Sequence, residues 1–320
     1  MAERIAVVGA GAVGGHVGAY MARAGNDVTL IDPWPEHVEA INAQGMTLDG
    51  QTDAECFNVP MRAIHLCDVQ AEAKSSGFDI VFMSTKSYDT RWATEMIAPY
   101  LAPGGFVVSL QNAINEPTIA DVVGWGRTLG MIASKISVEL YAPGRITRLV
   151  ALGGKDHTVF RVGECHGRNS ARAERLAELA SLADSSAVTT NLWGERWSKL
   201  SVNCMRNPIA AATGRGGNAN DHDPATRQLS IRLAAEAVAV GRAHGYQFDK
   251  LYGLDADDLI TVSAGDAAAM ARCEERVIEG TKTRSDQGRA SMGQDIAKGR
   301  RTEIDHLNGY VAARAIEVGM

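Results

Sequence analysis

The chain has 320 residues, of which 45% are apolar and 22% are charged. This length predicts two domains, and the composition excludes a disordered, collagenous or coiled-coil protein. The formal net charge of −6 argues against nucleic acid as a partner, because an acidic surface repels a phosphate backbone. No apolar stretch approaches the roughly 18 residues of a membrane span, so no membrane partner is expected. Five cysteines, odd in number and without a CxxC pair, indicate reduced thiols in the cytoplasm.

The first half of the chain alternates strand and helix signals. Short apolar runs predict buried parallel strands, and two of the segments between them carry helix patterns that end at glycine. The predicted strands are Ile5–Val8, Asp27–Ile31, Asp79–Met83, Gly105–Leu110 and Thr128–Ile132, and the predicted helices are His16–Ala24 and Glu36–Gln44. Such alternation is typical of an α/β fold with a Rossmann-type doubly wound sheet. Two further β-like segments, Arg145–Leu149 and Val159–Val162, follow.

From Ser170 onward the spacing of apolar residues predicts an almost continuous series of helices. They are Arg172–Leu182, Trp193–Cys204, Pro224–Ala243, Ala256–Glu279 and Asp286–Arg314. The polar stretch Gly163–Ser170 predicts the domain linker, and the polar segment Gly214–Asp223 predicts a loop between two helices. We therefore expect a dinucleotide-binding domain over residues 1–167 and an all-α substrate and catalytic domain over residues 168–320.

A glycine-rich segment lies directly after the first predicted strand and opens the first predicted helix. It reads Gly9-Ala10-Gly11-Ala12-Val13-Gly14. Its position fits the GxGxxG turn that binds a dinucleotide. Gly9 permits the tight turn, Gly11 lets the backbone approach a pyrophosphate, and Gly14 lets the helix pack closely on the strand. The N–H groups at the helix start would hold the phosphates. A strand-to-helix turn with glycines for geometry alone is the alternative.

Asp32, at the end of the second predicted strand, occupies the place of the acidic residue expected about 20 residues after such a turn. Its carboxylate would accept hydrogen bonds from the adenine ribose hydroxyls and would repel a 2′-phosphate. Arg23, Trp34 and His37 are near in sequence, but no basic residue follows Asp32 directly. The sequence therefore predicts NAD as the cofactor, with NADP as the alternative. The competing interpretation is that Asp32 only caps the loop before Pro33.

Lys199, Asn203 and Asn207 recur at i, i+4 and i+8, so they share one face of a predicted helix. Polar groups on a helix that is otherwise rich in Leu, Val and Met are costly in a dry core, so this face must meet water or a ligand. Pro208 removes a backbone hydrogen bond and predicts a kink that tilts Asn207 toward a cleft. A solvated helix face is the alternative.

Five motifs occur in a fixed order along the chain. They are Gly9–Gly15, Ser84–Lys86, Leu110–Asn112, Trp197–Pro208 and Ser291–Asp295, the last continuing through Thr302–Asp305 to Gly309. Together they resemble the ketopantoate reductase (2-dehydropantoate 2-reductase) family over nearly the whole chain. The resemblance implies an oxidoreductase that transfers hydride between a nicotinamide cofactor and a small 2-oxo or 2-hydroxy acid.

The resemblance also implies roles for single residues. Lys199 matches the family's general acid, which donates a proton to the ketone oxygen as hydride arrives, and Glu303 matches a glutamate that orients the lysine or the substrate hydroxyl. The positions that match substrate-binding residues are Asn203, Asn207 and Ser291, and those that match residues beside the nicotinamide and the substrate carboxylate are Asn112 and Lys86. For Lys86, a solvated lysine at a strand end is the alternative.

Three functions compete at this stage. The first is an NAD-dependent dehydrogenase or reductase of a small acid, which Asp32 favours because NADP-using members of the family carry a basic residue near that position. The second is a true NADPH-dependent ketopantoate reductase, which makes pantoate for coenzyme A synthesis. The third is a nucleotide sensor without catalysis, against which Lys199 and Glu303 argue. We expect no metal site, since the eight histidines show no HxH or HExxH pattern, and we expect a homodimer.

Overall fold

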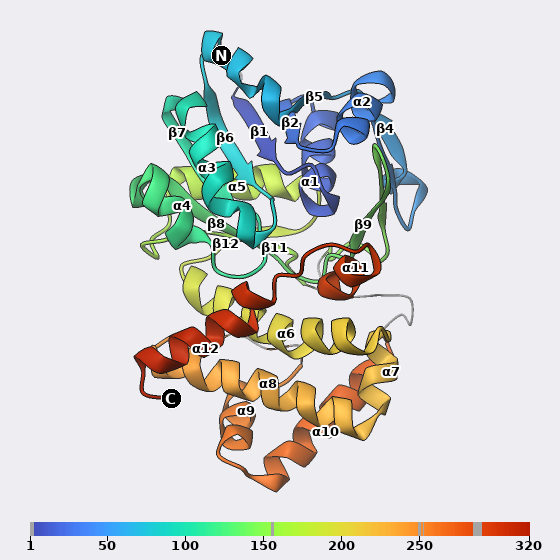
Figure 1. Ribbon diagram of the computed structural model, residues 1–320, viewed down its shortest axis with the longest axis vertical. Coiled ribbons are helices and arrows are strands. Elements are labelled where there is room, and N and C mark those ends of the chain that lie inside the picture. The colour runs from blue at the N-terminus through green and yellow to red at the C-terminus, as the bar shows by residue number, and fades with distance from the viewer. Residues whose placement is uncertain (1–2, 155–156, 249–250, 252, 284–289) are drawn as a thin grey trace. The chain divides into compact units, whose positions relative to one another are not determined.

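The computed structural model describes residues 3–154, 157–248, 251, 253–283 and 290–320 (Figure 1). They form two compact units, Met1–Leu192 and Trp193–Met320. This division lies later in the chain than the boundary expected after residue 167. The segment beyond that boundary stays with the first unit because α5 (Ala171–Ser181) packs on β11 (Phe160–Glu164) and β12 (Ser186–Val188), two strands that belong to the main sheet.

Within the described residues, the first unit contains an eight-stranded sheet with the order β12-β11-β8-β7-β6-β1-β2-β5. Besides β11 and β12, its strands are β5 (Arg62–His65), β2 (Asp27–Asp32), β1 (Arg4–Val8), β6 (Phe78–Met83), β7 (Leu101–Ser109) and β8 (Thr128–Ala133). From β5 to β8 all neighbours are parallel, whereas β11 runs antiparallel to β8. The predicted doubly wound sheet is therefore confirmed.

The two faces of this sheet are covered by different helices. Ile5 and Val7 of β1 join the core that includes α1 (Ala12–Arg23) and α5, whereas Ala6 and Val8 join the core beneath α3 (Thr90–Ile97) and α4 (Glu116–Val123). All four side chains are fully buried, as expected for a central parallel strand with helices on both faces. The alternation along β1 thus assigns each helix to its face.

A second, smaller sheet packs beside α1, and the sequence did not predict it as a whole. Its order is β4-β3-β10-β9, with β4 (Phe57–Val59), β3 (Met46–Asp49), β10 (Arg145–Arg148) and β9 (Val138–Ala142). It is reached from α2 (Pro35–Gln44), which Gly45 ends with a φ of 78°. The parallel pair β3–β10 joins segments far apart in the chain, so local patterns reveal only its second strand.

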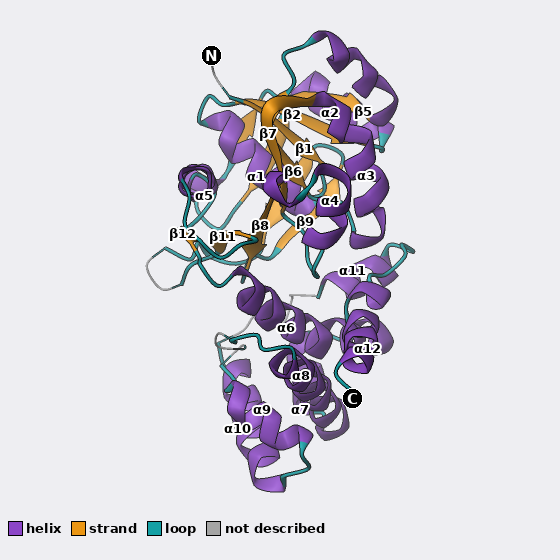
Figure 2. Cartoon of the chain, turned by 90° about the vertical axis from the view of Figure 1, so that its left-hand side faces the viewer, coloured by secondary structure: helices purple, strands orange, loops and turns teal. Residues whose placement is uncertain are grey.

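The second unit is helical, as Figure 2 shows by its colours. Its helices are α6 (Leu192–Thr213), α7 (Gly217–His222), α8 (Pro224–Ala243), α9 (Ala256–Ser263), α10 (Ala267–Thr281), α11 (Ser291–Ala297) and α12 (Asn308–Glu317). Their shared core includes Met205, Ile231, Val238, Leu259 and Val277. No helix of the described residues is both long and apolar enough to span a bilayer.

Three element predictions for this unit are wrong in detail. The single helix expected over Ala256–Glu279 is two helices, because Gly265 has a φ of 91° and Asp266 then caps α10 by accepting from the Ala269 N–H at 2.8 Å. The loop expected over Gly214–Asp223 contains α7. The helix expected over Asp286–Arg314 is α11 and most of α12, separated by a non-helical stretch; residues 286–289 lie outside the described part.

The remaining helix predictions differ mainly at their ends. Helix α1 begins at Ala12 rather than His16, directly after the glycine turn. Helix α6 continues past the expected end at Cys204 and through Pro208 to Thr213. The proline therefore lies inside a helix rather than at its end.

His16 is a buried histidine on the face of α1 that points into the core of the first unit. It is 1% exposed, and neither ring nitrogen has a hydrogen-bond partner among the described residues. Burial, aided by the positive charge of Arg148 and partly opposed by Asp184, lowers the pKa of His16 to about 3. Arg148 and Asp184 form a buried ion pair. The imidazole of His16 is therefore neutral near pH 7.

This burial predicts a loss of stability in acid. Below about pH 6.5 the unfolded chain protonates His16 while the folded chain does not, so the free energy of unfolding falls by about 1.4 kcal/mol per pH unit down to about pH 3. We expect His16→Gln to flatten this slope in urea unfolding between pH 6 and 4. The control is His222→Gln, because His222 is exposed. An unchanged slope in His16→Gln would contradict the assignment.

Candidate active site

The glycine-rich turn after β1 is packed too tightly for side chains at two of its positions. Gly9 has a φ of 91°, and a Cβ there would lie 2.9 Å from the backbone N of Thr85. A Cβ on Gly14 would lie 2.3 Å from the Gly9 carbonyl oxygen and 2.8 Å from the Ser84 Cβ. These distances are far below van der Waals contact, so only glycine allows α1 and the end of β6 to approach the turn this closely.

Gly11 is different, because the space in front of it is open. A Cβ at this position would meet nothing within 4 Å. Gly11 is also the N-cap of α1, which has neither a side-chain cap nor an acidic residue in its first turn. The first N–H groups of a helix lack intrahelical partners and carry its positive dipole end, so they bind anions. The turn therefore fits the pyrophosphate of a dinucleotide.

Asp32 at the end of β2 is bonded to this turn. Its Oδ2 accepts from the Ala10 N–H at 2.8 Å, and its Oδ1 accepts from the Trp34 N–H at 3.0 Å. The carboxylate thus caps the loop. An ionised carboxylate offers about four acceptor positions, so two accepted bonds leave capacity for ribose hydroxyls. The cap and the ribose contact are compatible roles.

Lys86 and Asn112 follow two adjacent parallel strands, β6 and β7, whose carboxyl ends lie at one edge of the sheet. Buried amide side chains hold the backbone at both positions. The Gln111 Nε2–H donates to the Thr85 carbonyl at 2.9 Å, and the Asn115 Nδ2–H donates to the Asn112 carbonyl at 2.7 Å. Gln111 belongs to the motif Leu110–Asn112, whereas Asn115 was not predicted from the sequence, although its place just after a strand end could have indicated it.

In the second unit, α6 carries the predicted polar face. Asn203 and Asn207 are 7% and 4% exposed, and Lys199 is partly buried. The Asn207 Oδ1 accepts from the Met292 N–H at 3.5 Å, which brings the start of α11 and Ser291 to α6. The side-chain amides of Asn203 and Asn207 are therefore buried, and that of Asn207 contacts the start of α11.

Glu303 is 5% exposed and directly precedes the short helix η6 (Ile304–His306). Five residues later, at the start of α12, the Asn308 Nδ2–H donates to the Cys204 carbonyl oxygen of α6 at 3.4 Å. Lys199, Asn203, Asn207, Ser291 and Glu303 thus all belong to the second unit, whereas the glycine turn, Asp32, Lys86 and Asn112 belong to the first.

The ammonium group of Lys199 is easier to deprotonate than an ordinary lysine. Burial and, to a lesser extent, the positive charge of Arg196 together lower the pKa of Lys199 to about 8. Arg196 is 1% exposed and lies three residues earlier on α6, so the two cations share one side of the helix. A lysine with this pKa can both donate and accept a proton near neutral pH.

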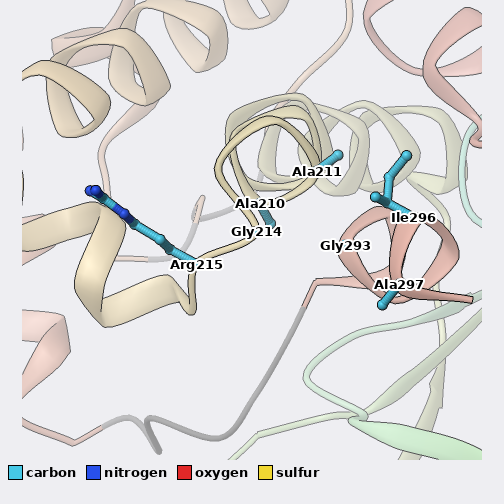
Figure 3. A pocket seen from close by; sticks show the side chains of 7 residues that line it. All are labelled: Ala210, Ala211, Gly214, Arg215, Gly293, Ile296 and Ala297. Atoms are coloured by element: carbon cyan, nitrogen blue, oxygen red, sulfur yellow. The ribbon is translucent and has the colours of Figure 1, made fainter.

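One turn beyond Asn207, α6 and α11 enclose a small pocket of about 130 Å³. Its lining residues are Ala210, Ala211, Gly214, Arg215, Gly293, Ile296 and Ala297. Figure 3 shows Ile296 and Ala297 on α11 opposite the alanines of α6, with Arg215 pointing away. The wall is therefore apolar. Among the described residues no group of three His, Cys, Asp or Glu side chains could hold a metal ion.

Both units match models of one protein family. Residues 5–160 match the family described as Ketopantoate reductase PanE/ApbA, and residues 191–320 match Ketopantoate reductase PanE/ApbA C terminal. The chain is 30% identical over 310 residues to a 2-dehydropantoate 2-reductase of Pyrococcus horikoshii, covering 96% of this chain and 89% of that one. It is 31% identical over 327 residues to one of Mesorhizobium japonicum, covering 95% and 89%. The chain therefore belongs to the ketopantoate reductase family of oxidoreductases.

Solved structures show the same architecture. A PanE/ApbA family ketopantoate reductase from Ralstonia eutropha JMP134 aligns with a TM-score of 0.77 and 28% identity, covering 99% of this chain and 93% of that one. D-mandelate dehydrogenase with NADH and anilino(oxo)acetate aligns with a TM-score of 0.79 over the same shares, at 20% identity, which indicates a common fold. The family and the fold class predicted from the motifs are both confirmed.

The glycine geometry predicts opposite outcomes for two alanine substitutions. Gly14→Ala forces a Cβ against backbone, so we expect the free energy of unfolding to fall by about 2–3 kcal/mol, the upper range for overpacking. Gly11→Ala has room and should cost less than about 1 kcal/mol. Urea unfolding of the cofactor-free proteins measures both. Equal losses would show that the crowding at Gly14 does not control the packing of α1.

Proposed function

We propose that this chain transfers hydride between NAD(H) and a small 2-oxo or 2-hydroxy acid, with Lys199 as the general acid and base. One observation carries the proposal: a partly buried lysine, with its pKa lowered to about 8, shares a helix face with two buried amides in a chain of this family. A structural lysine needs neither the lowered pKa nor the amides.

The chemistry at Lys199 follows from charge. Bound NADH supplies a hydride to the ketone carbon, and NAD⁺ accepts one in the reverse direction. In reduction, the Lys199 Nζ–H donates its proton to the carbonyl oxygen as negative charge develops there, which leaves a hydroxyl group. In oxidation, neutral Lys199 accepts the hydroxyl proton. Glu303 would orient the lysine or the substrate hydroxyl.

The substrate would be held by neutral and charged donors. Asn203, Asn207 and Ser291 offer amide and hydroxyl groups that can hydrogen-bond the carboxylate and the oxygen at the reacting carbon. Lys86 supplies a positive charge for a carboxylate, and Asn112 an amide for the nicotinamide. Their backbones are fixed by the bonds of Gln111 and Asn115, which reduces the conformational freedom lost on binding.

The cofactor would be held by the first unit. The N–H groups from Gly11 onward face an anion, and Asp32 has acceptor positions for ribose hydroxyls. A 2′-phosphate beside Asp32 would place like charges together, which supports NAD over NADP. The curated relatives named 2-dehydropantoate 2-reductase support the second candidate, an NADPH-dependent ketopantoate reductase. The fold alone does not decide between these two, because one fold hosts many activities.

Compartment and assembly complete the proposal. The five cysteines are free thiols, which suits the cytoplasmic location expected from the sequence. The homodimer expected from the helical domain stays a prediction.

The role of Lys199 predicts a large and selective loss. Lys199→Ala should lower kcat by about 10²–10⁴ and leave the Kd for NADH nearly unchanged, because the phosphate-binding turn belongs to the other unit. The matched control is Lys282→Ala, an exposed lysine paired with Glu279. In the unmodified protein, the rate of reduction should fall above about pH 8, where Lys199 loses its proton, and the rate of oxidation should rise through the same range. Near-normal kcat in Lys199→Ala would overturn the mechanism.

Cofactor choice is tested at Asp32. We expect the unmodified protein to have a higher kcat/KM with NAD(H) than with NADP(H). Asp32→Asn keeps the shape and removes the charge, so the ratio should fall about tenfold, and Asp32→Arg should narrow it further or invert it. Asp27→Asn, at the exposed start of β2, is the control. Equal or better use of NADP(H) by the unmodified protein would instead favour the biosynthetic reductase.

A further inference from the structure

The backbone of Ala10, in the middle of the glycine turn, is held on both sides by side chains from the end of β2 and the first turn of α2. The Ala10 N–H donates to the Asp32 Oδ2 at 2.8 Å. The Ala10 carbonyl oxygen lies 2.9 Å from the His37 Nε2, and His37, in the first turn of α2, is fully buried. The cofactor turn is therefore fixed by two side chains as well as by its glycines.

A second contact of His37 determines where its proton lies. The Gly144 N–H, in the turn between β9 and β10, donates to the His37 Nδ1 at 2.9 Å. A nitrogen that accepts a hydrogen bond carries no proton, so the proton of the neutral ring is on Nε2 and is donated to the Ala10 carbonyl. Trp34 stacks on the ring with centroids 5.5 Å apart and planes at 16°, and covers it.

The direction of this bond has a consequence for the next residue. In a trans peptide the carbonyl of Ala10 and the N–H of Gly11 point in opposite directions. Because the carbonyl points to the buried His37 ring, the Gly11 N–H points away from it. Gly11 is also the position where the turn has open space and where α1 begins. The N–H is thus presented where an anion can approach.

We propose that His37 is a positioning residue for the cofactor: it orients the Ala10–Gly11 peptide so that the Gly11 N–H meets the pyrophosphate of the bound dinucleotide. The inference rests on the proposed function only in that the chain binds a dinucleotide. It also gives the small sheet a role, since the Gly144 carbonyl accepts from the Thr47 N–H of β3 at 2.8 Å. The turn is thereby connected through His37 to β3, β9 and β10.

Two substitutions separate the two bonds of His37. The side-chain amide of glutamine reaches the place of Nε2 and can still donate to Ala10, whereas that of asparagine reaches the place of Nδ1 and can only accept from Gly144. We expect His37→Asn to raise the Kd for NADH about 3- to 10-fold, the loss for one hydrogen bond, and His37→Gln to change it less than about twofold. Fluorescence titration measures both constants.

Urea unfolding of the cofactor-free variants is the necessary comparison. Each variant loses one buried bond and the ring stacking, so both should be destabilised to a similar extent. A purely structural role would make the Kd follow stability in both variants, and equal Kd values in the two would overturn the proposal. A ¹⁵N NMR spectrum of the unmodified protein tests it without substitution: the proton must be on Nε2, and a proton on Nδ1 alone would contradict the inference.

The two cofactors distinguish this inference from the proposed function. NADH and NADPH share the pyrophosphate, so His37→Asn should weaken both by the same factor, whichever of them the unmodified protein prefers. A preference for NADPH would therefore overturn the role of Asp32 and leave that of His37 intact. Tight binding of both by His37→Asn would overturn only the role of His37. Binding of neither by the unmodified protein would overturn the proposed function and this inference together.

Discussion

The close approach of β1, α1 and β6 at the glycine turn is the constraint on which the first unit depends. The missing Cβ atoms of Gly9 and Gly14 let the N-terminus of α1 lie against the end of β6 at Ser84. This is also where the chain order of the sheet reverses, since β2 lies on one side of β1 and β6 on the other. In open α/β sheets a crevice forms outside the carboxyl ends of the strands at such a reversal. The crowding therefore fixes how α1 and β6 meet at this edge, where Asp32 ends β2 and Lys86 follows β6.

In the second unit, α6 contains a residue that lowers the stability of a helix. A proline inside a helix removes a backbone hydrogen bond and typically costs about 3 kcal/mol, yet α6 continues through Pro208. Packing of its apolar side chains supports it, because Leu200, Cys204 and Met205 are almost fully buried. The side chains of Asn203 and Asn207 are buried on the same helix, and the Asn207 Oδ1 accepts from the Met292 N–H at the start of α11. Such a helix depends for its stability on packing within its unit.

Local features of the sequence were sufficient to predict most strands and helices of the first unit and the helical character of the second. Buried parallel strands are apolar throughout, and the glycine turn has a fixed place between a strand and a helix, so both are visible in a short window. The small sheet is not, because the β3–β10 pair forms between segments about one hundred residues apart in the chain, and pairing over such distances leaves no local pattern. The structural division after Leu192 lies beyond the expected boundary for a related reason: β12 is three residues long and joins the sheet through β11.

Some site residues could likewise be recognised from local sequence, and others could not. The i, i+4 spacing of Lys199 and Asn203 is a property of one helix and could be recognised directly. His37 could not, because in the sequence it is only a residue near the start of a helix, and its meaning comes from Gly144 in a distant turn. The break at Gly265 was visible as a glycine within a helical pattern, but glycine is tolerated inside helices, and only its φ of 91° identifies it as an end.

Burial lowers the pKa of Lys199, and the mechanism proposed above uses this shift in both directions of the reaction. A lysine with an ordinary pKa of about 10.4 is about 0.04% neutral at pH 7, so it can donate a proton but hardly ever accept one. With the pKa of Lys199 lowered to about 8, about one molecule in ten carries the neutral amine at that pH. The proton-donating form still predominates, so reduction loses little. In the proposed mechanism, oxidation gains a base that is more than a hundredfold more abundant, at the expense of burying a charged side chain beside Arg196.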